Sequence, residues 1–124
     1  MSDHNGSVLA YIGDAVLSLQ VREYLVSKSI TQAKTLLKRS ILFVSAESQA
    51  DFMNHLLKTN ELSEEELLIY KRGRNHKSSS IAKNADVISY RVATGLEALW
   101  GYLYLEQKHE RLEQLWKKYR EYVD

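Results

Sequence analysis

The feature that most constrains this chain is the absence of proline from its 124 residues, which also include only five glycines. Because these two residue types interrupt helices, long helices can run through most of the sequence. Apolar residues recur at helical spacing in several segments, and no stretch shows the convincing alternation of a strand. We therefore predict one all-α domain over residues 1–124, a length that suits a single core.

The first half of the chain predicts two helical regions. Residues 7–27 carry two apolar stripes at helical spacing, which predicts a central helix buried on nearly all sides. Residues 31–58 form a second, long helical region, with Thr31 as its N-cap and a break expected near Ser40 or Ser45. Both regions would contribute to one helical core.

The second half predicts three more helices. Ser63 and Glu66 have the spacing of a capping box, which marks a helix start and explains the run of glutamates better than a metal cluster would. Residues 70–86 lack a hydrophobic period and are predicted to be a loop. Asp86 can cap a helix over residues 86–108, and a last helix covers residues 109–123.

Composition excludes several classes of protein. There is no cysteine, which rules out disulfides, thiolate zinc sites and a cysteine nucleophile. The net charge is +1, so attraction to polyanions must come from a local patch. The opening "MSDHNGS" is unlike a signal peptide, and no apolar run reaches the roughly 18 residues of a membrane span. We expect a cytoplasmic protein without membrane partners.

One such patch lies in the predicted loop. Between Lys71 and Asn84 the sequence has five lysines and arginines, one histidine and no acid. Arginine and lysine beside small hydrogen-bonding residues suit phosphate contacts, as in nucleic-acid binding. A solvated surface loop would have a similar composition. The sequence leaves both interpretations open.

Two carboxylates lie among apolar and small residues, where a charge is costly unless it is paired. Asp14 sits within "LAYIGDAVLSL", beside Gly13, and Glu97 shares a helical stripe with Thr94 and Gly101. Small residues of this kind permit close helix crossings. A hard cation such as Mg²⁺ would offset the cost, because it binds carboxylate oxygens. Pairing with an arginine, a tyrosine or a backbone amide is the commoner solution, and periodicity does not show whether the two acids meet.

Three stretches together resemble a known family. "YIGDAVL" at residues 11–17 resembles the signature helix of ribonuclease III catalytic domains. "RGRNHKSS" and "AKNADVISYR", followed by "GLEALWGYLYLE", resemble the compact branch of that family, the mini-ribonuclease III proteins. These proteins lack the appended double-stranded-RNA-binding domain. The resemblance runs from about Ala10 to Leu112, and the basic loop is its most specific part.

The resemblance implies an all-helical homodimer that cleaves double-stranded RNA with Mg²⁺ and leaves 5′ phosphate and 3′ hydroxyl ends. Asp14 matches the signature aspartate, a catalytic metal ligand, and Glu97 matches a second ligand. Further residues match the branch's RNA-binding loop: Arg72, Arg74, Asn75, Lys77, Lys83 and Asn84. The implied substrate is the precursor of large-subunit (23S) ribosomal RNA. A ribosomal protein is a further candidate partner.

The chain departs from full-length ribonuclease III at two acidic positions, where it has Ala10 and Thr94. The compact branch shares both losses, but they leave fewer carboxylates at each site, and one Mg²⁺ is a safer expectation than two. Two alternatives therefore remain. The chain could be a catalytically weak or inactive helical module that binds RNA or the ribosome, or a purely structural helical dimer with salt-bridged acids.

Overall fold

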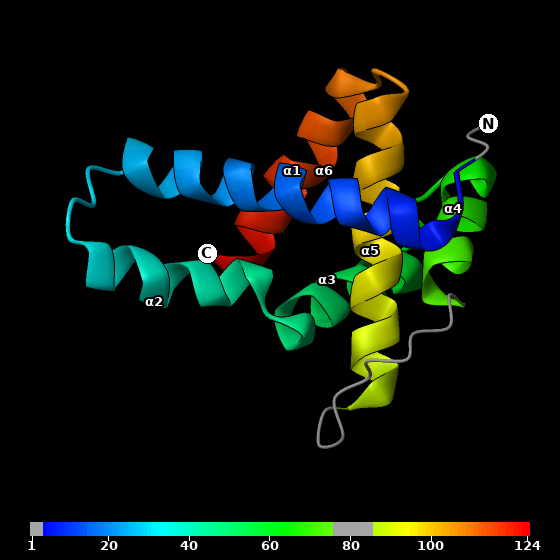
Figure 1. Cartoon of the computed structure of the whole chain (residues 1–124), viewed down its shortest axis with the longest axis horizontal. Coiled ribbons are helices and arrows are strands. Elements are labelled where there is room, and N and C mark those ends of the chain that lie inside the picture. Colours follow the sequence, from blue (N-terminus) through cyan, green and yellow to red (C-terminus); the bar gives the residue numbers. More distant parts are fainter. Residues whose placement is uncertain (1–3, 76–85) are drawn as a thin grey trace.

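The computed structural model describes residues 4–75 and 86–124, which form six helices and no strand (Figure 1). The helices are α1 (Gly6–Ser27), α2 (Ala33–Val44), α3 (Ala46–Lys58), α4 (Glu64–Arg74), α5 (Val87–Leu105) and α6 (His109–Val123). The predicted all-α class is confirmed. None of these described helices is long and apolar enough to cross a membrane.

The second helical region breaks at Ser45, one of the two positions that the sequence suggested. Ser45 ends α2 in extended geometry, and its hydroxyl accepts the backbone N–H of Ser48 in the first turn of α3. The prediction of Thr31 as N-cap of this region is wrong, because the cap is Gln32, whose side chain makes no capping bond. Ile30 packs against the core and Gln32 is still extended, so the helix starts later than expected.

The other predicted caps are confirmed. Ser63 and Glu66 form a reciprocal capping box at the start of α4. The Asp86 carboxylate accepts the backbone N–H groups of Ile88 and Ser89 at the start of α5. Side-chain oxygens of this kind satisfy amide groups that have no partner inside the helix.

The central helix of the fold is α5, which contacts α1, α3, α4 and α6 (Figure 1). The expectation that residues 7–27 are buried on nearly all sides is wrong. One stripe of α1 packs inward, but Tyr11, Leu19 and Val26 on its other faces are 79%, 58% and 59% exposed. Two apolar stripes make a helix look buried in sequence, but among the described residues most of the outer stripe of α1 stays exposed.

Helix α4 runs further than predicted, because residues 70–74 continue the helix instead of opening the loop. Tyr70 is 2% exposed in the core, and Gly73 is buried against α5. A Cβ at Gly73 would lie 2.5 Å from the Cβ of Ala98, so the glycine permits a close approach of the two helices. This tertiary contact keeps the last turn of α4 helical where local composition suggested a loop.

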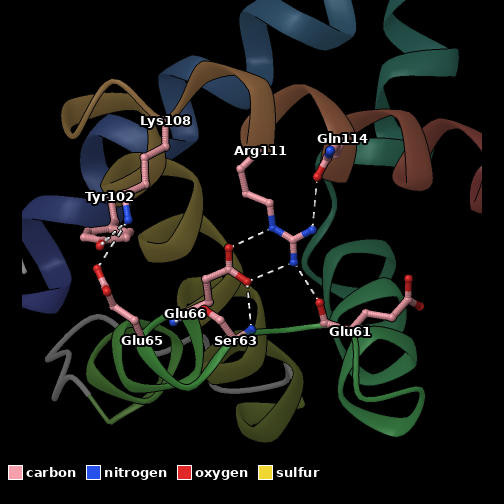
Figure 2. Close-up of polar contacts among 8 residues, drawn as sticks. All are labelled: Glu61, Ser63, Glu65, Glu66, Tyr102, Lys108, Arg111 and Gln114. Carbon is pink, nitrogen blue, oxygen red and sulfur yellow. Dashed lines mark hydrogen bonds and ion pairs between the residues drawn. The ribbon is translucent and has the colours of Figure 1, made fainter.

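A polar latch joins α4 to α6 (Figure 2). Arg111 on α6 donates to both carboxylate oxygens of Glu66, at 2.8 and 2.9 Å, and to the Glu61 backbone carbonyl at 2.7 Å. The Glu66 residue is 6% exposed. Burial alone would raise the pKa of Glu66, but hydrogen bonds from Arg111 and Ser63 outweigh it and lower that pKa. The glutamate run at the start of α4 is thus explained by capping and by this latch.

Candidate active site

The candidate site lies where α1 crosses α5 in backbone contact (Figure 1). A Cβ added at Gly13 would lie 1.7 Å from the Glu97 carbonyl oxygen, and one at Gly101 would lie 1.9 Å from the Leu9 carbonyl oxygen. Only glycine fits in such gaps, since any Cβ would overlap the facing backbone. The small residues beside the two acids therefore do mark a tight helix crossing.

This crossing brings Asp14 and Glu97 together in one pocket of about 270 Å³. Residues of both helices line it: Ser7, Ala10, Tyr11, Asp14, Tyr90, Thr94 and Glu97. The apolar and small residues beside Asp14 in the sequence suggest a buried charge, but that expectation is wrong, because Asp14 is exposed where it lines the pocket. It sits at the edge of the inward stripe of α1, on the side where the pocket opens.

The electrostatics of the pair are dominated by Glu97. The pKa of Glu97 is raised to about 8. Burial is the largest cause, followed by a hydrogen bond with Asp14 and by repulsion from the Asp14 charge, whereas a hydrogen bond from Gln49 lowers this pKa. Two carboxylates in contact cannot both ionise cheaply, so the pair holds a proton near neutral pH. A cation between them would take the place of that proton.

The residues present fit a hard divalent cation such as Mg²⁺. Mg²⁺ takes oxygen ligands, and proteins commonly hold it with one or two carboxylates while waters and substrate phosphates complete its shell. Among the described residues, no group of three or more histidine, cysteine, aspartate or glutamate side chains could hold a metal. In the part of the chain that the structure describes, the acids that line this pocket are Asp14 and Glu97, and two carboxylates would leave other coordination positions of a bound cation open.

The basic residues of the predicted loop fall partly on α4. The Arg72 guanidinium donates to the His4 carbonyl at 2.9 Å, and Arg74 donates to the Asn75 side chain at 3.2 Å while lying over the Tyr70 ring. Arg72 thus ties the chain before α1 to α4. The other three candidate RNA contacts lie outside the described residues: Lys77, Lys83 and Asn84.

The end of α4 lies close to the carboxylate pocket. A Cβ at Gly6, in the first turn of α1, would lie 2.4 Å from the Arg72 carbonyl oxygen. A Cβ at Gly73 would lie 3.0 Å from the carbonyl oxygen of Thr94, a pocket residue. Arg74 and Asn75 therefore flank the helices that carry the two acids.

Sequence reasoning missed two residues of this site. Tyr11 is highly exposed at the pocket and was hidden inside an apolar run. Gln49, on α3, is buried and interacts with the Glu97 carboxyl. A signal for Gln49 existed, because it occupies an inward position at helical spacing from the apolar Phe52, Met53 and Leu56.

Comparison with known proteins identifies the family. Residues 7–108 match the Ribonuclease III domain. The chain is 52% identical over 111 residues to "Mini-ribonuclease 3" of Enterococcus faecalis, covering 90% of this chain and 84% of the relative. It is 46% identical over 114 residues to "Mini-ribonuclease 3" of Staphylococcus aureus, covering 92% and 85%.

A solved structure agrees with the fold. The crystal structure of protein FN1578 from Fusobacterium nucleatum superposes with a TM-score of 0.81 at 33% identity, covering 91% of this chain and 88% of that one. The family match spans both helices of the carboxylate pocket. The chain therefore belongs to the ribonuclease III family, in its compact branch, the mini-ribonuclease III proteins.

Proposed function

We propose that this endoribonuclease cleaves double-stranded RNA at the pocket between α1 and α5, with Mg²⁺ held by Asp14 and Glu97. The observation that carries the proposal is the meeting of two carboxylates, 83 residues apart in sequence, in one open pocket. A pocket with two acids and open coordination positions suits a metal whose remaining ligands come from a phosphodiester.

The chemistry expected of Mg²⁺ there is to activate a water and to offset charge on the scissile phosphate and the leaving 3′ oxygen. Asp14 faces solvent at the pocket mouth, where a substrate phosphate arrives. Glu97 is more buried than Asp14 and interacts with both Asp14 and Gln49. The products would carry 5′ phosphate and 3′ hydroxyl ends.

The RNA contacts of the proposal are Arg72, Arg74, Asn75, Lys77, Lys83 and Asn84. An A-form duplex is recognised mainly by shape and by backbone contacts across its minor groove. The end of α4 lies beside the pocket, which supports phosphate contacts by Arg74 and Asn75 close to the cleavage site. Because Arg72 also binds the His4 carbonyl, a change at Arg72 would combine structural and RNA-binding effects.

A homodimer is part of the proposal. Tyr11, Leu19 and Val26 of α1 are exposed, and an apolar pocket of about 470 Å³ opens between α1, Tyr104 and the start of α6. A second copy packed on this face would bury the outer stripe of α1. The active-site helix would then lie at the interface, and two sites could cut the two strands of one duplex, leaving short 3′ overhangs.

The substrate that we propose is the precursor of 23S ribosomal RNA, cut at its duplexed ends in the cytoplasm, with a ribosomal protein as a further partner. This rests on the resemblance to the compact branch. The second candidate is a catalytically weak or inactive module that binds RNA or the ribosome. The small number of carboxylates supports this second candidate, because the acids that line the pocket, within residues 4–75 and 86–124, are Asp14 and Glu97.

The decisive experiment incubates the purified protein with a labelled RNA duplex, with and without Mg²⁺. We compare the wild type with Asp14→Asn and Glu97→Gln, and with Glu110→Gln as a control at an exposed acid in the first turn of α6. We expect Mg²⁺-dependent cuts in the wild type and the control and none in the two site variants. If neither a simple duplex nor a structured ribosomal RNA precursor is cut, the binding module replaces the enzyme.

A second prediction concerns the RNA contacts. Arg74→Ala is expected to weaken RNA binding and to reduce the salt slope of log Kd by about one, because one phosphate contact is lost. Lys117→Ala, at an exposed cation on α6, should leave the slope unchanged. Binding is measured by fluorescence anisotropy without divalent metal at several salt concentrations. An Arg74→Ala slope equal to that of the wild type would remove Arg74 from the interface.

A further inference from the structure

Gln49 is a buried amide next to the carboxylate pocket. Among the described residues, the buried side chains outside the apolar and aromatic core are Gln49, which is 2% exposed, and Glu66, which is 6% exposed. Glu66 belongs to the latch with Arg111. Since burying a polar group is costly unless it is hydrogen-bonded, the contacts of Gln49 require an explanation.

The Gln49 amide is held at the corner between α2 and α3. Its Nε2 donates to the Val44 carbonyl, at 3.3 Å, in the last turn of α2. Carbonyls in the last turn of a helix lack intrahelical partners, so this bond satisfies an otherwise open acceptor. The bond fixes the rotation of the amide, and with it the direction of the second N–H.

The same side chain reaches Glu97 on α5. The Gln49 amide acts on the Glu97 carboxyl as a hydrogen-bond donor that lowers the pKa of Glu97, and α3 packs directly on α5. Glutamine donates through nitrogen, so it can hold one oxygen of the Glu97 carboxylate and leave the other available to a cation. A core-filling role alone would be served better by leucine or methionine, which need no partner.

We propose that Gln49 is a positioning residue for Glu97, orienting its carboxylate so that one oxygen faces Asp14 and a divalent cation. The inference rests on the proposed metal site and adds to it a third helix, α3. Groups that orient metal ligands from behind typically change metal affinity by about 10- to 100-fold when they are removed.

The test measures Mn²⁺ binding to the metal-free protein, without RNA, from the loss of the free Mn²⁺ signal in electron paramagnetic resonance. The variants are Gln49→Met, which keeps the length and loses the amide, and Gln49→Asn, which keeps the amide but is one methylene too short. The matched control is Gln20→Met. Gln20 is partly buried and accepts the Trp100 indole N–H at 2.8 Å, so its loss removes an internal hydrogen bond away from the pocket.

We expect Gln49→Met to weaken Mn²⁺ binding about tenfold or more, and Gln49→Asn to weaken it as well. Gln20→Met should bind Mn²⁺ within twofold of the wild type, even if its urea midpoint falls as far as that of Gln49→Met. Wild-type Mn²⁺ affinity in either folded Gln49 variant would overturn the inference. If Glu97→Gln also binds Mn²⁺ like the wild type, the proposed metal site itself fails. Lost binding in Glu97→Gln with retained binding in Gln49→Met would refute only the role of Gln49.

Discussion

Replacing Gly13 by alanine tests the helix crossing on which the site depends. The new Cβ would lie 1.7 Å from the Glu97 carbonyl oxygen and 2.8 Å from the Gly101 nitrogen. Carbon and oxygen atoms that are not bonded rarely approach closer than about 3.3 Å, so α1 and α5 would have to separate by about 1.5 Å. Both obstacles are backbone atoms of the central helix, which cannot rotate away as a side chain could.

The expected loss of stability follows from two opposing effects. Overpacking typically costs about 1–3 kcal/mol, and a clash with backbone belongs at the upper end of that range or beyond it. Alanine has a better helix propensity than glycine by about 1 kcal/mol. We therefore expect the free energy of unfolding of Gly13→Ala to fall by about 2 kcal/mol or more, although the same change at an exposed helical glycine would raise it.

Urea unfolding, followed by the fluorescence of the buried Trp100 and Trp116, measures this loss at fixed protein concentration. With a slope of about 2 kcal/mol per M, the midpoint should fall by about 1 M or more. Ser18→Ala on the same helix is the control and should gain a few tenths of a kcal/mol. If Gly13→Ala is as stable as the wild type, α1 and α5 are not in backbone contact and the argument for the crossing is refuted.

The same substitution should damage the site more than the fold. The added methyl separates the two segments that carry Asp14 and Glu97. A misplacement of about 1 Å can lower a catalytic rate about a hundredfold. We expect cleavage by the folded Gly13→Ala protein to fall by about that factor, measured under single-turnover conditions well below the urea midpoint.

Two further predictions concern charge. Arg111→Met should lower the free energy of unfolding by about 3 kcal/mol, because it removes the ion-pair partner of the buried Glu66 carboxylate. Lys108→Met, at a half-exposed ion pair, should lower it by less than about 1 kcal/mol. Equal losses of the two variants in urea unfolding would contradict this prediction. In chelator, the stability contributed by Glu97 should be full below about pH 4.5 and should decline as the pH rises to about 8, because the folded state retains a proton that the unfolded state has released. Thermal unfolding across that pH range should show this decline in the wild type, and Glu97→Gln should remove most of it.

Much of the fold was predictable because its signals are local. These signals are helix periodicity, the absence of proline, the capping box at Ser63 and the cap at Asp86. Each depends on residues within a few positions of one another. The misplaced boundaries have a different cause. Residues 70–74 stay helical because Tyr70 and Gly73 pack on α5, and no signal inside the segment reports that contact.

The candidate site also has a part that the sequence predicted and a part that it did not. The sequence by itself identified Asp14 and Glu97 and the small residues beside them, since a charge among apolar and small residues is conspicuous wherever the chain folds. Only the tertiary structure decided that the two acids share a pocket, that Asp14 is exposed, and that Gln49 of a third helix interacts with Glu97. Those facts depend on how three helices cross, and a crossing is set by contacts between residues far apart in the chain, which a one-dimensional pattern does not contain.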